Sequence, residues 1–116
     1  MNLKPLLICL TIACAPGWAS AAPSYLQYGA YQKAKEEPLA RGYMSGLVRG
    51  VMMANDMIKS STGKPLFCLP PNLGVNREFG NDLIDAVAEL AAPENRSKLP
   101  VDALLMKGMK DMFPCP

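Results

Sequence analysis

The chain has 116 residues, which is enough for one small domain. It contains no histidine, so Ser–His and Cys–His nucleophilic pairs are excluded and the commonest transition-metal ligand is missing. Twelve basic and ten acidic residues give a formal net charge of +2, without a basic stripe interleaved with aromatic residues, so we expect no binding to nucleic acid. We expect a protein that is not an enzyme and that holds no metal or other cofactor. We attribute its abundant methionine to core filling and an adaptable surface rather than to copper(I) binding.

The N-terminal segment, residues 1–21, has the pattern of a signal peptide. A positive charge precedes an apolar run over residues 6–13, and Ala19-Ser20-Ala21 fits the small-residue rule for signal peptidase. The run is too short to span a bilayer as a helix of about 20 residues. We expect cleavage near Ala21-Ala22 and export to the periplasm, with a lipoprotein cleaved before Cys14 as the alternative. No second long apolar segment follows, so we expect no membrane span in the mature protein.

Export determines how the cysteines are interpreted. Cys9 and Cys14 would leave with the signal peptide, which leaves Cys68 and Cys115 in an oxidising compartment. These two most simply pair with each other, and the alternative is two buried free thiols. A disulfide between them would hold the C-terminal tail, which ends Phe113-Pro114-Cys115, against the middle of the chain.

The segment 22–37 is expected to be an N-terminal arm or a short helix. Tyr25, Tyr28 and Tyr31 stand three residues apart within it. We favour aromatic side chains that cover one end of the core, and a docking arm for a partner is the alternative.

The main helix is expected from Pro38 to about Ser61, because proline suits a first helical turn. Apolar residues recur in it at three- and four-residue spacing, which is helical periodicity: Leu39, Tyr43, Leu47, Val51, Ala54 and Ile58. Gly42, Gly46 and Gly50 form a column on one face, although each glycine costs a helix about 1 kcal/mol against alanine. The column predicts close approach of another backbone, in a crossing within the chain or, alternatively, at a subunit or partner interface.

Two further helices are expected in the C-terminal half. The main helix is expected to end at Gly63 and Pro65, and the Pro70-Pro71 pair prevents a helix through Cys68. Asn76 is a typical N-cap for a helix over residues 77–92, with Phe79, Leu83, Val87 and Leu90 as its apolar stripe. A polar turn over residues 93–100 then leads to a last helix over 101–113, with Leu104, Leu105, Met109 and Met112 buried. The sequence therefore predicts an all-α fold: a small single-domain bundle of about four helices with one disulfide.

Three motifs in this order resemble the Rap/Tai family of periplasmic immunity proteins of type VI secretion systems. They are a glycine-tyrosine-x-x-glycine helix, a phenylalanine-cysteine-x-proline loop and a terminal phenylalanine-proline-cysteine. The residues that match are Gly42, Tyr43, Gly46, Phe67, Cys68, Pro70, Phe113, Pro114 and Cys115. The resemblance covers roughly residues 39–115, within a helical domain over 38–116. A second cysteine pair seen in many members is missing, because Ala40 stands where one of those cysteines would be.

The resemblance implies a small helical protein, often a homodimer, that binds and blocks a peptidoglycan amidase injected by sister cells. An inhibitor of a cleft needs a rigid protrusion, so two loops are candidates for contact with such an amidase. The candidate residues are Gly63, Lys64 and Pro65 in the first loop and Glu94, Asn95, Arg96 and Lys98 in the second. The alternatives are a small periplasmic holdase-like chaperone and an accessory envelope protein without a toxin partner.

Overall fold

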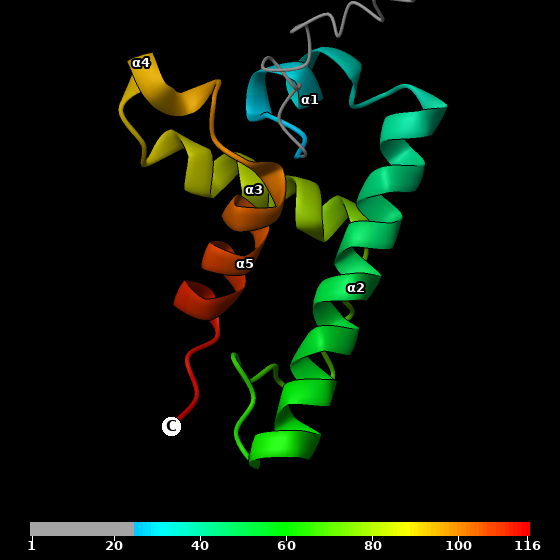
Figure 1. The fold of residues 1–116 in the computed structure, drawn as a ribbon, viewed down its shortest axis with the longest axis vertical. Helices are drawn as coiled ribbons and strands as arrows, with labels where there is room; N and C mark the ends of the chain where they lie inside the picture. Colours follow the sequence, from blue (N-terminus) through cyan, green and yellow to red (C-terminus); the bar gives the residue numbers. More distant parts are fainter. Residues whose placement is uncertain (1–24) are drawn as a thin grey trace, which may run out of the picture.

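The computed structural model describes residues 25–116, and the expected signal peptide and Cys14 lie outside this part. The described chain is an all-α domain, as expected (Figure 1). It contains α1 (Tyr28–Ala34), α2 (Pro38–Thr62), α3 (Arg77–Glu89), α4 (Pro93–Arg96) and α5 (Val101–Met112). The polar turn expected over residues 93–100 thus contains the single-turn helix α4.

The ends of the helices follow from local sequence. Pro38 is the first residue of α2, where its missing N–H removes no intrahelical bond. Gly63 ends α2 with a φ of 80°, a left-handed conformation that glycine adopts without a steric penalty. Asn76 caps α3 as predicted, because its side-chain oxygen accepts a hydrogen bond from the backbone N–H of Phe79.

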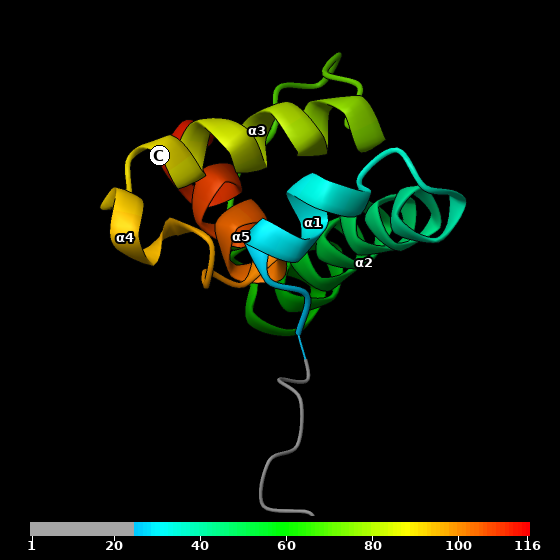
Figure 2. The same cartoon turned by 90° about the horizontal axis from the view of Figure 1, so that it is seen from above.

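The core lies where α2, α3 and α5 meet (Figures 1 and 2). Helices α3 and α5 approach closely at Gly108, where an added Cβ would lie 2.6 Å from Cγ of Leu83. Helices α2 and α3 approach closely at Gly80, where a Cβ would lie 2.7 Å from a methyl carbon of Val48. The largest fully buried side chains are those of Tyr31, Phe67, Met44, Ile84, Leu105, Met109 and Val101.

Helix α1 is part of this core, as its aromatic residues predicted. The Tyr31 side chain is completely buried, and its hydroxyl donates a hydrogen bond to the side-chain oxygen of Asn81 on α3. The segment before α1 is bonded to the start of α5, because the N–H of Val101 donates to the carbonyl of Leu26 over 2.9 Å. Tyr25 is exposed, so the covering role belongs to Tyr28 and Tyr31.

The apolar residues that give α2 its helical periodicity do not all face the core. Leu39 is 85% exposed and Tyr43 is 39% exposed, whereas Val51 is buried. The buried residues of α2 are Ala40, Met44, Val48, Val51 and Asn55. The periodicity was real but did not identify the core, because α2 carries apolar residues on two faces. The predicted burial of Met112 is wrong, since this side chain is 54% exposed, and Leu90 at the end of the apolar stripe of α3 is also exposed.

Candidate protein-binding site

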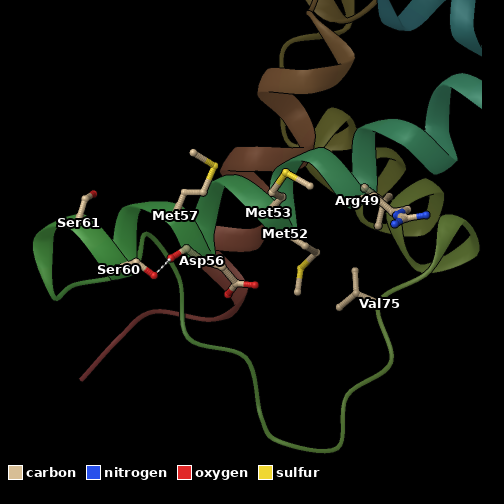
Figure 3. A pocket seen from close by; sticks show the side chains of 9 residues that line it. Arg49, Met52, Met53, Asp56, Met57, Ser60, Ser61 and Val75 are labelled. Carbon is tan, nitrogen blue, oxygen red and sulfur yellow. Dashed lines mark hydrogen bonds between the residues drawn. The ribbon is translucent and has the colours of Figure 1, made fainter.

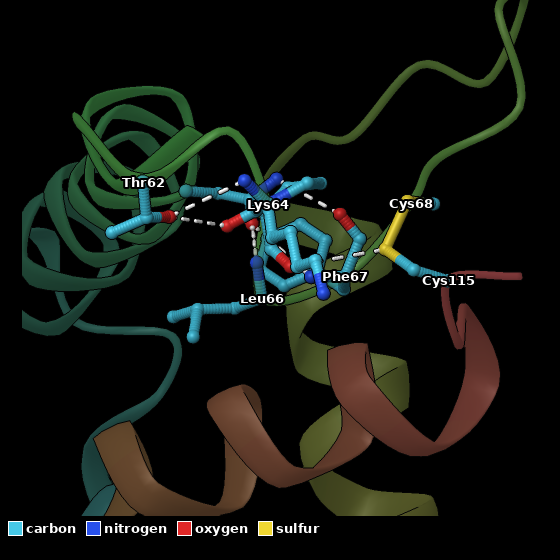
Figure 4. Close-up of a disulfide and its surroundings, with 8 residues drawn as sticks. Thr62, Lys64, Leu66, Phe67, Cys68 and Cys115 are labelled. Carbon is cyan, nitrogen blue, oxygen red and sulfur yellow. Dashed lines mark hydrogen bonds between the residues drawn. A yellow bond between two sulfur atoms is a disulfide. The ribbon is translucent and has the colours of Figure 1, made fainter. Parts of the chain in front are cut away.

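The disulfide predicted between Cys68 and Cys115 is present, with the two Cα atoms 4.9 Å apart (Figure 4). It joins the C-terminal tail to the α2–α3 loop, residues 63–76, across a sequence separation of 47 residues. The backbone N–H of Cys68 also donates to the carbonyl of Phe113 over 2.8 Å. In the chain-entropy description, closing a loop of this length stabilises the fold by about 4 kcal/mol.

Asn55 provides a second anchor for the same loop, and the sequence analysis did not single it out. Its side-chain oxygen accepts from the backbone N–H groups of Leu66 and Phe67, at 2.8 and 3.1 Å. Its amide nitrogen donates to the carbonyl of Phe67 over 3.0 Å. The only sequence signal was an asparagine four residues after Val51, on the face that proved to be buried. A buried side chain with all its polar atoms bonded fixes the loop against α2.

Two of the three family-like motifs meet in space around this anchor. Phe67 is completely buried beside Cys68, and Phe113 packs on Phe79 of α3 with ring centroids 6.1 Å apart. The third motif lies apart from them, since Gly42 and Gly46 are exposed on α2. The phenylalanine-cysteine-x-proline motif and the terminal phenylalanine-proline-cysteine motif therefore build the anchored loop. The glycine-tyrosine-x-x-glycine motif forms part of a separate surface.

An open groove runs between the anchored loop and α2. It consists of two adjoining hollows of about 730 and 370 Å³ that share Met52 and Asp56. Figure 3 shows the side chains of Met52 and Asp56 directed toward the arching loop, with Val75 on the opposite side. Charged residues at the rim and apolar residues at the base make this groove suited to a protein segment.

The outward face of α2 carries a largely exposed stripe, of which Leu39 and Tyr43 line a hollow together with Tyr31 of α1. We call it the α2 stripe: Leu39, Gly42, Tyr43, Gly46, Gly50, Met53 and Met57. A Cβ added at any of its three glycines would meet nothing within 4 Å. The expectation that this column packs against another helix of the same chain is therefore wrong. The alternative, a subunit or partner interface at this column, stays a prediction.

The second candidate loop, residues 94–98, is partly committed to the fold. The guanidinium of Arg96 donates to the carbonyls of Ala88, Glu89 and Ala91, at 2.9, 3.1 and 3.2 Å. Arg96 thus satisfies the free carbonyls at the C-terminal end of α3. Glu94, Asn95 and Lys98 are exposed.

The first candidate loop leaves its charged residue free to reach a partner. Gly63 and Lys64 are exposed beyond the end of α2, and Pro65 is half-buried. The hydroxyl of Thr62 lies 2.7 Å from the carbonyl of Ile58 and 3.0 Å from that of Lys64, which holds the turn against α2 (Figure 4).

A polar cluster around Asp85 fastens α1 to α3. The hydroxyl of Tyr28 donates to the Asp85 carboxylate over 2.9 Å, and the amide of Gln32 donates to the same oxygen. Burial, followed by the hydrogen bond and charge of Asp85, raises the pKa of Tyr28 to about 12. Burial and the same charge raise the pKa of Tyr31 to about 12. Both tyrosines are therefore protonated at neutral pH, and their hydroxyls act as hydrogen-bond donors that hold α1 against α3.

Within residues 25–116, no three cysteine or carboxylate side chains gather closely enough to hold a metal ion. None of the helices in this part of the chain is long and apolar enough to cross a membrane. A comparison of the chain with protein-family models, with curated protein sequences and with solved structures finds no match to any of them. The anchored loop, the groove beside it and the α2 stripe are the candidate contact surfaces of the described chain.

Proposed function

We propose that this protein is an exported immunity protein, which binds a type VI secreted peptidoglycan amidase in the periplasm and blocks its active site. The resemblance of the three motifs supplies the family and the class of target. The proposal includes the homodimer that this resemblance implies. It also implies that the protein acts by stoichiometric binding and performs no catalysis.

One observation carries the proposal: the α2–α3 loop is preorganised. Asn55 holds its start, and the disulfide between Cys68 and Cys115 holds its middle. A loop whose shape is fixed before binding loses little conformational entropy when it enters a cleft. Lys64 stands exposed beside this anchored segment and can reach an acidic or carbonyl-lined rim.

The test is a titration of a purified type VI amidase with the disulfide-bonded protein, using hydrolysis of isolated peptidoglycan sacculi as the readout. We expect complete inhibition at about one protein per amidase, because a tight inhibitor is consumed stoichiometrically. Full amidase activity at a large excess of the protein would refute the immunity proposal.

Variants of the candidate loops locate the contact. We expect Lys64→Glu to weaken the affinity for the amidase about tenfold, because it reverses a charge near the cleft. Lys98→Glu tests the second loop in the same way, whereas Arg96 is unsuitable because its removal would disturb α3. Lys110→Glu is the matched control, since Lys110 is exposed on α5. Equal affinities for all three variants would remove both loops from the interface.

A holdase-like chaperone is the second candidate function, because several large apolar side chains are exposed. Leu39, Met57 and Leu90 are 85, 64 and 82% exposed. Such side chains on different helices could hold unfolded clients without a fixed geometry. The chaperone would be favoured if the protein suppressed the aggregation of several unrelated unfolding proteins but did not inhibit the amidase at an equimolar ratio.

A further inference from the structure

Two bonds of different kinds hold neighbouring residues of the α2–α3 loop. The backbone N–H of Phe67 donates to the buried side chain of Asn55 over 3.1 Å. The next residue, Cys68, is joined to residues 113–116 by the disulfide, and its N–H donates to the carbonyl of Phe113 over 2.8 Å. A thiol cleaves a disulfide but leaves a hydrogen bond to a side-chain amide intact. A reductant can therefore release the loop at Cys68 while Asn55 still holds it at Phe67.

The two sulfur atoms of this disulfide differ in their access to solvent. Cys68 is half-buried, whereas Cys115 is exposed between Pro114 and Pro116, which are exposed as well and have no N–H to bond. Sγ of Cys115 lies 3.9 Å from the carbonyl oxygen of Pro65 (Figure 4). Thiol–disulfide exchange begins when a thiolate reaches one of the two sulfur atoms, so its rate depends on access to that atom. A thiolate in solution therefore reaches Sγ of Cys115 more readily than Sγ of Cys68.

We propose that the Cys68–Cys115 disulfide is a redox-controlled clasp on the outer half of the α2–α3 loop, residues 68–76, which a dithiol oxidoreductase opens at Cys115. A thiolate of the oxidoreductase bonds to Sγ of Cys115, the S–S bond to Cys68 breaks, and the sulfur of Cys68 leaves as a thiolate that takes up a proton. The second thiol of the oxidoreductase then displaces Cys115 as a thiol. The protein gains two electrons and two protons, and the oxidoreductase becomes a disulfide.

The opened protein keeps its helical core. The buried cluster of the described chain comes from α1, α2, α3 and α5, and Phe67 is its single member from the loop. Asn55 continues to bond Leu66 and Phe67, and the ring of Phe113 continues to pack on Phe79. The part released by reduction is therefore residues 68–76, which ends at the N-cap of α3.

The released segment forms one wall of the groove. The hollow of about 370 Å³ is lined by Leu69, Pro70, Pro71 and Leu73 from this segment, together with Met52 and Asp56 of α2. Once the segment is released, a partner must order it on binding, which costs affinity. The clasp thus regulates the binding of a target to the loop. This last step rests on the proposed function, whereas the chemistry at Cys115 does not.

The first experiment identifies the sulfur that is attacked. The disulfide-bonded protein is incubated with glutathione and quenched in acid, and mass spectrometry of its peptides locates the bound glutathione. We expect about tenfold or more glutathione on Cys115 than on Cys68, because Cys115 is the accessible sulfur. The control is the same reaction in guanidinium chloride, where unfolding exposes both sulfurs and the difference should vanish. Equal amounts on the two cysteines of the folded protein, or an excess on Cys68, would overturn the proposal.

The second experiment measures the release of the loop, by NMR hydrogen exchange of the oxidised protein and of the protein reduced with dithiothreitol. We expect the amide of Cys68 to exchange about tenfold or more faster after reduction, and that of Phe67 to change by less than about threefold. Asn55→Ala with its disulfide intact is the matched variant, in which Phe67 should lose protection and Cys68 should keep it. Complete unfolding on reduction, seen as loss of far-UV circular dichroism, would overturn the proposal, as would unchanged exchange at Cys68.

The third experiment separates this proposal from the immunity function. The double variant Cys68→Ser and Cys115→Ser is permanently open, so it enters the amidase titration without a reductant. We expect it to bind the amidase about tenfold more weakly than the disulfide-bonded protein. Equal inhibition by the two proteins would overturn the regulatory role of the clasp and leave the immunity function standing. If the disulfide-bonded protein itself does not inhibit, the immunity function fails, and the glutathione and exchange results still decide whether the clasp opens at Cys115.

Discussion

The two sides of α2 are both largely apolar, but only one of them is covered. The inward side buries Met44, Val48 and Val51 together with the polar Asn55, and α3 approaches it closely at Gly80. The outward side presents Leu39, Met53 and Met57 to the surroundings. A buried asparagine is stable here because each of its polar atoms has a partner in the α2–α3 loop.

The comparison teaches that glycines on helices have two separate uses in this protein. Gly80 and Gly108 stand where an added Cβ would collide with a neighbouring side chain. The column of Gly42, Gly46 and Gly50 stands where a Cβ would meet open space. The first pair serves packing within the fold, whereas the column lowers the helix propensity of α2 without allowing a closer approach inside the described chain.

The largest expected effect is on the inward side, at Asn55. We expect Asn55→Ala to lower the free energy of unfolding by about 3 kcal/mol, because it leaves two buried N–H groups and a carbonyl without partners. Urea denaturation at neutral pH measures the change. Asn72→Ala is the control, since Asn72 is exposed in the same loop and should change stability by less than about 0.5 kcal/mol. A loss at Asn55 as small as that of the control would show that the loop is held by the disulfide alone.

The next effect is at the close approach of α3 and α5. We expect Gly108→Ala to lower the free energy of unfolding by about 2 kcal/mol, because the new methyl group would press on the Leu83 side chain. Thermal unfolding followed by circular dichroism measures it. Combining Gly108→Ala with Leu83→Val, which removes atoms at the contact, should recover part of the loss. Unchanged stability in the single variant would mean that α3 and α5 can move apart at no cost.

Much of the fold could be predicted from local sequence signals. Pro38, Gly63 and Asn76 mark helix ends through their own backbone and side-chain chemistry, and the structure places these ends within one residue of the prediction. The disulfide was predicted from the two cysteines that would remain after the expected removal of a signal peptide, and it is present in the structure. These features depend on few neighbours, so the sequence alone contains the necessary information.

The candidate site could be predicted only in part. The core face of α2 could not be predicted, because the helix has two apolar faces and periodicity cannot tell which one meets α3 and α5. The role of Asn55 depends on a loop more than ten residues away in sequence, whose path the sequence does not reveal. Arg96 was predicted as a contact residue because it is charged, but the carbonyls that it binds belong to the end of α3.

A smaller effect of opposite sign is expected on the outward side. Gly46→Ala should raise the free energy of unfolding of the monomer by about 0.5–1 kcal/mol, because alanine favours the helix and its methyl group meets open space. The measurement is made at a protein concentration low enough to keep the protein monomeric. Destabilisation by Gly46→Ala would show that the column packs within the fold and would remove the contrast with Gly108.

The last effect concerns tyrosines, and it is absent at neutral pH because it appears only in alkali. The pKa of Tyr31 is raised to about 12, chiefly by burial, whereas an unfolded tyrosine titrates near pH 10. The folded protein therefore keeps a proton that the unfolded chain releases, so the stability is fully present below about pH 10 and falls between pH 10 and 12. We expect Tyr31→Phe to flatten this fall in urea denaturation, relative to the unchanged protein.

Tyr43→Phe is the matched variant on the outward side. Its pKa is also raised by burial, but Tyr43 is 39% exposed whereas Tyr31 is completely buried. If Tyr43→Phe reduced the fall of the free energy of unfolding between about pH 10 and 12 more than Tyr31→Phe does, Tyr43 would be the more tightly packed tyrosine. That result would contradict the conclusion that the outward side of α2 is the uncovered one.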